Sequence, residues 1–161
     1  MSIIDTLVTD RSIADIATLK SLLSKSFTAM STAEQAAWLQ DSKGAYNASD
    51  LNRVGQALNY LNQLMTLRCG KMFSWTAKVD WTYQDVPTLA QLQNYAQQIT
   101  DVRNALVVPA STASVPKMPK LTYQQANDIE VILQLCDQLV KNVIAAFKYT
   151  GVTECAVGGL V

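Results

Sequence analysis

One apolar spacing occurs twice in this chain, and it restricts both stretches to amphipathic helices. Counted from Val54, apolar residues follow at +3, +4, +7, +10 and +11, and the same offsets counted from Ile129 are also apolar. These intervals trace one face of an α-helix, whose period is 3.6 residues, and they leave the other face polar. An asparagine, Asn52 or Asn127, stands two residues before each of these anchors. We therefore expect two matching helices, each with one buried and one solvated face.

Three further helices follow from periodicity and from capping signals. Apolar residues at helical spacing predict helices over about 10–27 and 88–107. A Ser31–Glu34 capping box begins a short helix that we expect to carry Trp38 and Leu39 inward and to end at Gly44. The face expected to be buried in the first helix consists of Ile13, Ile16, Leu19, Leu23 and Phe27.

The two repeated stretches complete the expected set of helices, over about 49–68 and 123–149, and the first ends at Gly70. Residues 1–9 form an N-terminal arm, and residues 152–161 form a glycine-containing tail that is flexible or bound to a partner. Between the helices, residues 71–87 alternate loosely between apolar and polar types, which indicates an extended or hairpin excursion.

These elements predict an all-α fold. The anchors Val54, Tyr95 and Ile129 are unequally spaced, which argues against a stacked solenoid of fixed period. We expect one domain over residues 1–161, built as a compact antiparallel bundle of four to five helices with the excursion around 71–87 attached to it.

The composition argues against most catalytic chemistry. The chain has no histidine, which removes the usual general base and the commonest metal ligand. Its three cysteines are widely spaced, and Cys136 falls on the apolar stripe as a small core residue. Asp128 and Glu130 are two residues apart and point to different sides of a helix, so they do not form a carboxylate pair. We expect no enzyme activity, no metal and no cofactor.

The charge balance and the hydropathy of the sequence indicate which classes of partner to expect. Lys plus Arg total 13 and Asp plus Glu total 13, so no overall field favours nucleic acid. The start of the chain lacks a basic, apolar signal peptide, and no apolar run is long enough to cross a bilayer. We therefore expect no nucleic-acid partner and no membrane insertion.

Two groups of residues are candidates for contacts. The aromatic residues of the excursion either pack beneath it or expose ring faces to a glycan or a protein; they are Phe73, Trp75, Trp81 and Tyr83. The second group is Asn52, Asn127 and, at the matching place in the fourth helix, Gln93. These amides either satisfy backbone groups of the loop that enters each helix or form a polar ring for ligand recognition.

Four separated segments, residues 44–54, 80–81, 86–88 and 121–130, resemble a family of small helical proteins of tailed phages and prophages of Gram-positive, largely clostridial, bacteria. The resemblance covers about residues 10–151. It implies a minor virion component, made in the host cytoplasm, that is associated with tail, baseplate or receptor-binding proteins. The tail after Gly151 departs from this pattern, because relatives often end soon after an aromatic-x-x-Gly element.

The resemblance and the residues together favour a non-enzymatic structural or adaptor protein of the virion. Its expected partners are other virion proteins, in a multi-copy or homo-oligomeric assembly. The alternatives are a glycan-binding module that uses Trp75, Trp81 and Tyr83, a head-associated or decoration subunit, and a prophage regulator that is never packaged.

Overall fold

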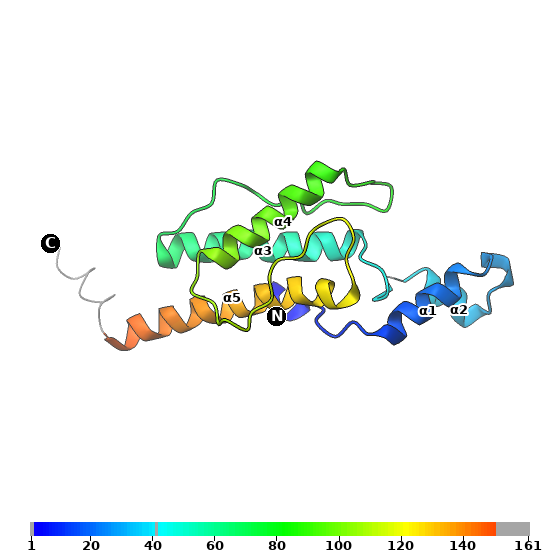
Figure 1. Cartoon of the computed structure of the whole chain (residues 1–161), viewed down its shortest axis with the longest axis horizontal. Coiled ribbons are helices and arrows are strands. Elements are labelled where there is room, and N and C mark those ends of the chain that lie inside the picture. Colours follow the sequence, from blue (N-terminus) through cyan, green and yellow to red (C-terminus); the bar gives the residue numbers. More distant parts are fainter. Residues whose placement is uncertain (1, 41, 151–161) are drawn as a thin grey trace.

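The computed structural model describes residues 2–40 and 42–150, with side chains as far as residue 147 (Figure 1). This part of the chain forms five α-helices and no β-strand, which confirms the all-α prediction. The helices are α1 (Ile13–Leu23), α2 (Thr32–Trp38), α3 (Ala48–Cys69), α4 (Leu89–Asn104) and α5 (Tyr123–Thr150), with short 3-10 turns at Ile3–Thr6 and Phe27–Ala29. The predicted tail, residues 152–161, lies outside the described residues.

Reciprocal side-chain caps begin the first four of these helices. Ser31 and Glu34 form the predicted capping box at the start of α2. Ser12, Asn47 and Thr88 cap α1, α3 and α4 in the same way, each with an acidic or amide residue three positions later.

Two glycines were predicted to end helices, and the structure confirms this for Gly70 and contradicts it for Gly44. Gly70 has a φ of 62° and ends α3 in the left-handed conformation, as predicted. The predicted end of the second helix at Gly44 is wrong, because α2 ends at Trp38. Gly44 instead packs against α1, where an added Cβ would lie 2.4 Å from the carbonyl oxygen of Asp15.

The hydrophobic core lies between α3, α4 and α5. The two repeated apolar stripes face each other across it, and α4 completes the third side. Cys136 is fully buried among these residues, as expected of a small core side chain. Ile4 and Leu7 of the N-terminal arm also join the core, against α3 and α5. The fully buried residues of this core include Val54, Leu58, Leu61, Ile99, Val102, Leu133 and Val140.

The three long helices run parallel, not antiparallel as expected. Arg53 contacts Glu130 and Tyr60 contacts Asp137, so a step of seven residues along α3 matches a step of seven along α5. Figure 1 shows α4 running in the same direction. An extended chain covers at least twice the length per residue of a helix. The connections over 70–88 and 105–122 are therefore long enough to return along the bundle.

Helices α1 and α2 form a helical hairpin, residues 12–40, that extends from one end of the bundle (Figure 1). Because it does not lie on the core, the inward face expected for this region is largely wrong. Ile16 and Leu19 are half-buried, but Leu22 is the buried leucine of α1 in place of Leu23. The large apolar side chains that remain exposed are Ile13, Leu23, Phe27, Trp38 and Leu39.

Candidate functional site

The segment over residues 71–87, here called the crossover, returns along α3 in extended conformation and is held by asparagine side chains. The Asn52 amide accepts a hydrogen bond from the Trp81 N–H and donates one to the Trp81 carbonyl, each at 2.8 Å. Asn59 binds Ala77 in the same two-point way, at 2.8 and 3.0 Å. Each amide thus presents to the crossover the donor and acceptor that a neighbouring β-strand would offer.

A third asparagine continues this row towards the end of α3. Asn62 accepts from the Phe73 N–H at 3.1 Å and donates to the carbonyls of Phe73 and Trp75, both at 3.2 Å. Positions 52, 59 and 62 share one helical face, and Gly55 lies among them. An added Cβ at Gly55 would lie 2.5 Å from the Lys78 carbonyl oxygen, so the glycine permits the close approach of the crossover.

In the second repeated helix, Asn127 holds the residue Arg11, just before α1, by the same pair of hydrogen bonds. Asn127 on α5 accepts from the Arg11 N–H at 3.0 Å and donates to the Arg11 carbonyl at 2.9 Å. The matching asparagines of the two repeats therefore each clamp one extended residue, although neither segment is the loop that enters its helix. Gln93 is exposed on α4 and does not share this arrangement.

The four candidate aromatic residues have different surroundings. Trp81 is 8% exposed and belongs to the core. Phe73 and Trp75 are half-buried and stack on each other, with ring centroids 5.1 Å apart, and the Trp75 Nε1 donates to Asp101 at 2.9 Å. Tyr83, at 77%, is the exposed member of the group. The structure therefore does not bring the four rings together as one exposed platform.

A buried cluster of four charged side chains joins the N-terminal arm to α3 and α5. The Arg11 Nη2 lies 2.7 Å from Asp50 and 2.6 Å from Glu130. Arg53 pairs with the same two carboxylates, at 3.0 Å from Glu130. Glu130 also accepts from the Val8 N–H. With two cations and two anions, the cluster has no net charge.

The pKa values of Arg53 in this cluster and of two other groups, Tyr46 and Cys136, are raised above their ordinary values. Burial alone would lower the pKa of Arg53, but its bonds to Glu130 and Asp50 more than offset that effect and raise it. Burial also raises the pKa of Tyr46, whose hydroxyl lies 2.6 Å from that of Tyr95, and it raises the pKa of the Cys136 thiol to about 11. These groups hold the fold together and offer no nucleophile or base near neutral pH.

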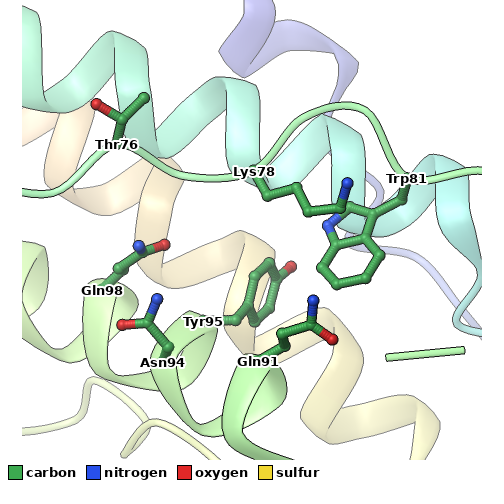
Figure 2. Close-up of a pocket in the computed structure, with 7 residues that line it drawn as sticks. All are labelled: Thr76, Lys78, Trp81, Gln91, Asn94, Tyr95 and Gln98. Carbon is green, nitrogen blue, oxygen red and sulfur yellow. The ribbon is translucent and has the colours of Figure 1, made fainter. Parts of the chain in front are cut away.

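A cavity of about 100 Å³ lies between the crossover and α4 (Figure 2). Thr76, Lys78 and Trp81 line it from the crossover. Three amides line it from α4, together with the Tyr95 ring; they are Gln91, Asn94 and Gln98. Within the described residues, no group of three or more histidine, cysteine or acidic side chains is placed to hold a metal ion, and no helix has the length and hydropathy needed to span a membrane.

The sequence reasoning missed both the charged cluster and the cavity. Asp50 and Arg53 flank the first repeat, and Glu130 directly follows the anchor Ile129, so their closeness to the apolar stripe was the available signal. Glu130 was considered with Asp128, but its partners are arginines from other elements. Comparisons of this chain with protein-family models, with curated proteins and with solved structures found no match.

Proposed function

We propose that this protein is a non-enzymatic adaptor of a tailed-phage particle, associated with the tail or baseplate, and that it acts by docking onto other virion proteins. The resemblance of residues 44–54, 80–81, 86–88 and 121–130 to phage proteins supports the particle as its location. The exposed apolar surface of the helical hairpin supports docking as its mode of action.

The helical hairpin is the observation that carries the proposal. Ile13, Leu23 and Leu39 are 74%, 60% and 76% exposed, and the rings of Phe27 and Trp38 are also exposed. Large apolar side chains gathered on one protruding element are typical of a protein interface. Since α1 and α2 lie beside the bundle, a partner can cover them without disturbing the core.

The hairpin is anchored at its base. The Asn127 amide holds the Arg11 backbone just before α1, and the Lys43 ammonium binds both carboxylate oxygens of Asp10 at 2.8 and 2.7 Å. Gly44 packs closely against the α1 backbone. An element with a fixed base presents its apolar side chains in a defined direction, which lowers the entropy cost of docking.

Particle incorporation tests the proposal. A tagged chain would be produced in cells that make the particles, and its copy number in purified particles measured by mass spectrometry. We expect the wild-type chain in the particles, and at least about a tenfold loss for a Leu23→Ser, Leu39→Ser double variant, since each 1.4 kcal/mol of lost contact is tenfold in affinity.

The matched control is a Val86→Ser, Val107→Ser double variant, whose two valines are 88% and 96% exposed on other elements. This control should enter particles at the wild-type level, and both double variants should melt within a few degrees of wild type. Particles without peptides of this chain, or hairpin variants incorporated as well as wild type, would contradict the proposal.

A further inference from the structure

Helix α1 carries an apolar stripe that the bundle does not cover. Ile13, Ile16 and Leu23 recur, together with Lys20, at intervals of three, four and three residues, which is the spacing of two helices that pack along their length. Ile13 is 74% exposed, Leu23 is 60% exposed and Ile16 is half-buried. Figure 1 shows α1 beyond the end of the bundle. The stripe therefore has the pattern of a helix–helix contact but lies at the surface.

The helical hairpin has little core of its own to support α1. Leu22 and Met30 are its two buried apolar side chains. Helix α1 has 11 residues and α2 has 7, and isolated helices of this length are marginal in water. A helix that packs on α1 from outside would supply the tertiary contacts that the bundle does not give it.

The charges of α1 favour a second copy of this helix in antiparallel orientation. Asp15 lies in its first turn, Lys20 lies in its last turn, and Lys25 follows just beyond. Two parallel copies would set the Lys20 side chains against each other within the stripe. Two antiparallel copies place the acidic half of each helix beside the basic half of the other. The antiparallel pair is therefore complementary in charge as well as in its apolar stripe.

The spacing also gives the register of such a pair. When Ile13 of each copy lies beside Leu23 of the other, the twofold axis passes near residue 18. Ile16 then lies beside Lys20 of the second copy, and that lysine is at the level of Asp15. Each large apolar side chain of the stripe thus meets a neighbour, and the lysine is the polar member of the contact.

We propose that two copies of this protein pair through α1 in this antiparallel arrangement. The pairing covers Ile13, Ile16 and Leu23, while Trp38 and Leu39 near the end of α2 stay exposed for a virion protein. The inference rests on the proposed docking role of the helical hairpin, and it names a second copy as the partner of one of its two helices.

Sedimentation equilibrium of the full chain tests the pairing. A contact made by one 11-residue helix is at the small end of specific interfaces, so we expect a dimer with a Kd on the order of 10–100 μM. An Ile13→Ser, Leu23→Ser double variant should bind at least about tenfold more weakly. The Val86→Ser, Val107→Ser variant, changed at exposed valines on other elements, should dimerise as wild type does.

A second variant should strengthen the pair. Lys20→Leu replaces the polar member of the stripe, and a polar residue at such a position lowers the stability of a helical pair. We expect the Kd to fall at least about tenfold, with the dimer remaining the largest species. Ser21→Leu adds the same side chain to an exposed position outside the stripe and should leave the Kd unchanged.

Disulfide trapping tests the orientation in a chain that carries Cys69→Ser and Cys155→Ser. An equal mixture of Ile13→Cys and Leu23→Cys variants should give a cross-linked dimer under mild oxidation. Each variant alone should not, because identical positions lie about 15 Å apart along an antiparallel pair, beyond the reach of a disulfide. Cross-linking of each variant with itself, and not in the mixture, would show parallel pairing.

The proposal is overturned if the chain remains monomeric up to about 500 μM, well above the expected Kd. It is also overturned if the Ile13→Ser, Leu23→Ser variant dimerises as wild type does, or if the cysteines report parallel pairing. A monomer that still enters particles through the helical hairpin would overturn the pairing but not the docking proposal. A dimer that is absent from particles would support the pairing and contradict the docking proposal.

Discussion

At the scale of single residues, the side-chain amide of asparagine performs the work that a β-strand performs elsewhere. The backbone of the crossover has no strand beside it, yet its N–H and carbonyl groups must be satisfied where they are buried. Asn52, Asn59 and Asn62 meet this need from one face of α3, and Gly55 leaves room for the approach. The polar side of an amphipathic helix here fixes the path of another segment.

Replacing Asn59 by alanine should therefore destabilise the protein more than an ordinary polar truncation on α3. The change leaves the N–H and carbonyl of Ala77, a residue 3% exposed, without their partners. An unsatisfied buried group costs about 1–3 kcal/mol, so we expect a loss of about 2–4 kcal/mol in the free energy of unfolding by urea. Gln63→Ala, exposed on the same helix, should change it by about 0.5 kcal/mol at most. Equal effects of the two changes would show that the asparagine bonds do not hold the crossover.

At the scale of elements, the contribution of an ion pair to the stability of the fold depends on how deeply the pair is buried. Arg11 connects the N-terminal arm to α3 and α5, with side-chain exposures of 2% for Arg11 and 0% for Glu130. Lys43 and Asp10 form a surface pair close by, with exposures of 47% and 70%. Two residues between the N-terminal arm and α1, Asp10 and Arg11, therefore take part in an exposed and a buried ion pair.

Arg11→Ala should cost about 3–5 kcal/mol, because it leaves two buried carboxylates with one arginine. Lys43→Ala should cost at most about 1 kcal/mol, because its pair is solvated. Denaturant unfolding of the two variants under identical conditions measures both values. A small effect of Arg11→Ala, similar to that of Lys43→Ala, would show that Arg53 alone satisfies the cluster.

The helical hairpin should have its own dependence on pH. The hydrogen bond from Lys25, together with that from the Ser31 N–H, lowers the pKa of Glu34 from 4.5 to about 2. Because this pKa is lower in the folded state, the stabilisation is present above about pH 4.5 and is lost as the pH falls towards 2. A titration of the Glu34 side-chain carbon by NMR should show the low midpoint.

The variant Lys25→Ala removes the largest cause and should move the Glu34 midpoint upwards. Lys20→Ala, on α1 of the same helical hairpin, lies outside this ion pair and is the control. An unchanged midpoint in Lys25→Ala would mean that the cap at Ser31 sets the pKa of Glu34 by itself.

At the scale of the whole molecule, the parallel course of the helices could not be predicted from periodicity. Apolar spacing identifies helices and their buried faces, and it did so for α3, α4 and α5, but it carries no direction. The direction depends on how the connections run. Asn52, Asn59, Asn62 and Gly55 were the sequence feature that could have predicted the path of the crossover. They mark a second side of α3, which contacts neither solvent nor the hydrophobic core.

The candidate site was less predictable than the fold. Aromatic residues at alternating positions can pack inwards or outwards, and the sequence left both open for Trp75 and Trp81. Gln98 is a polar residue within the apolar stripe of α4, and the structure places it at the cavity. The exposed face of the helical hairpin could not be foreseen, because its side chains have the spacing of a core helix.

Removal of residues 2–11 tests how far the N-terminal arm and the two residues that follow it belong to the core. The deletion takes away the buried side chains of Ile4 and Leu7 and one of the two arginines of the charged cluster, Arg11. Each apolar side chain contributes about 1.5–3 kcal/mol and the cluster about 3–5, which together approach the whole stability of a typical domain. Circular dichroism at 222 nm should show loss of the cooperative thermal transition. Thr6→Ala, exposed in the same arm, should retain it.

The bond between Arg11 and Glu130 has a consequence for synthesis, because 119 residues separate the two in the chain. Ribosomes add about 5–20 residues per second, so the guanidinium waits roughly 6–24 s before that carboxylate leaves the exit tunnel. Until then the growing polypeptide can form isolated turns of helix, but α5 is not yet available to complete the hydrophobic core. Completion of the core therefore waits until α5 has left the exit tunnel, and chaperones that bind emerging chains have a defined interval in which to act.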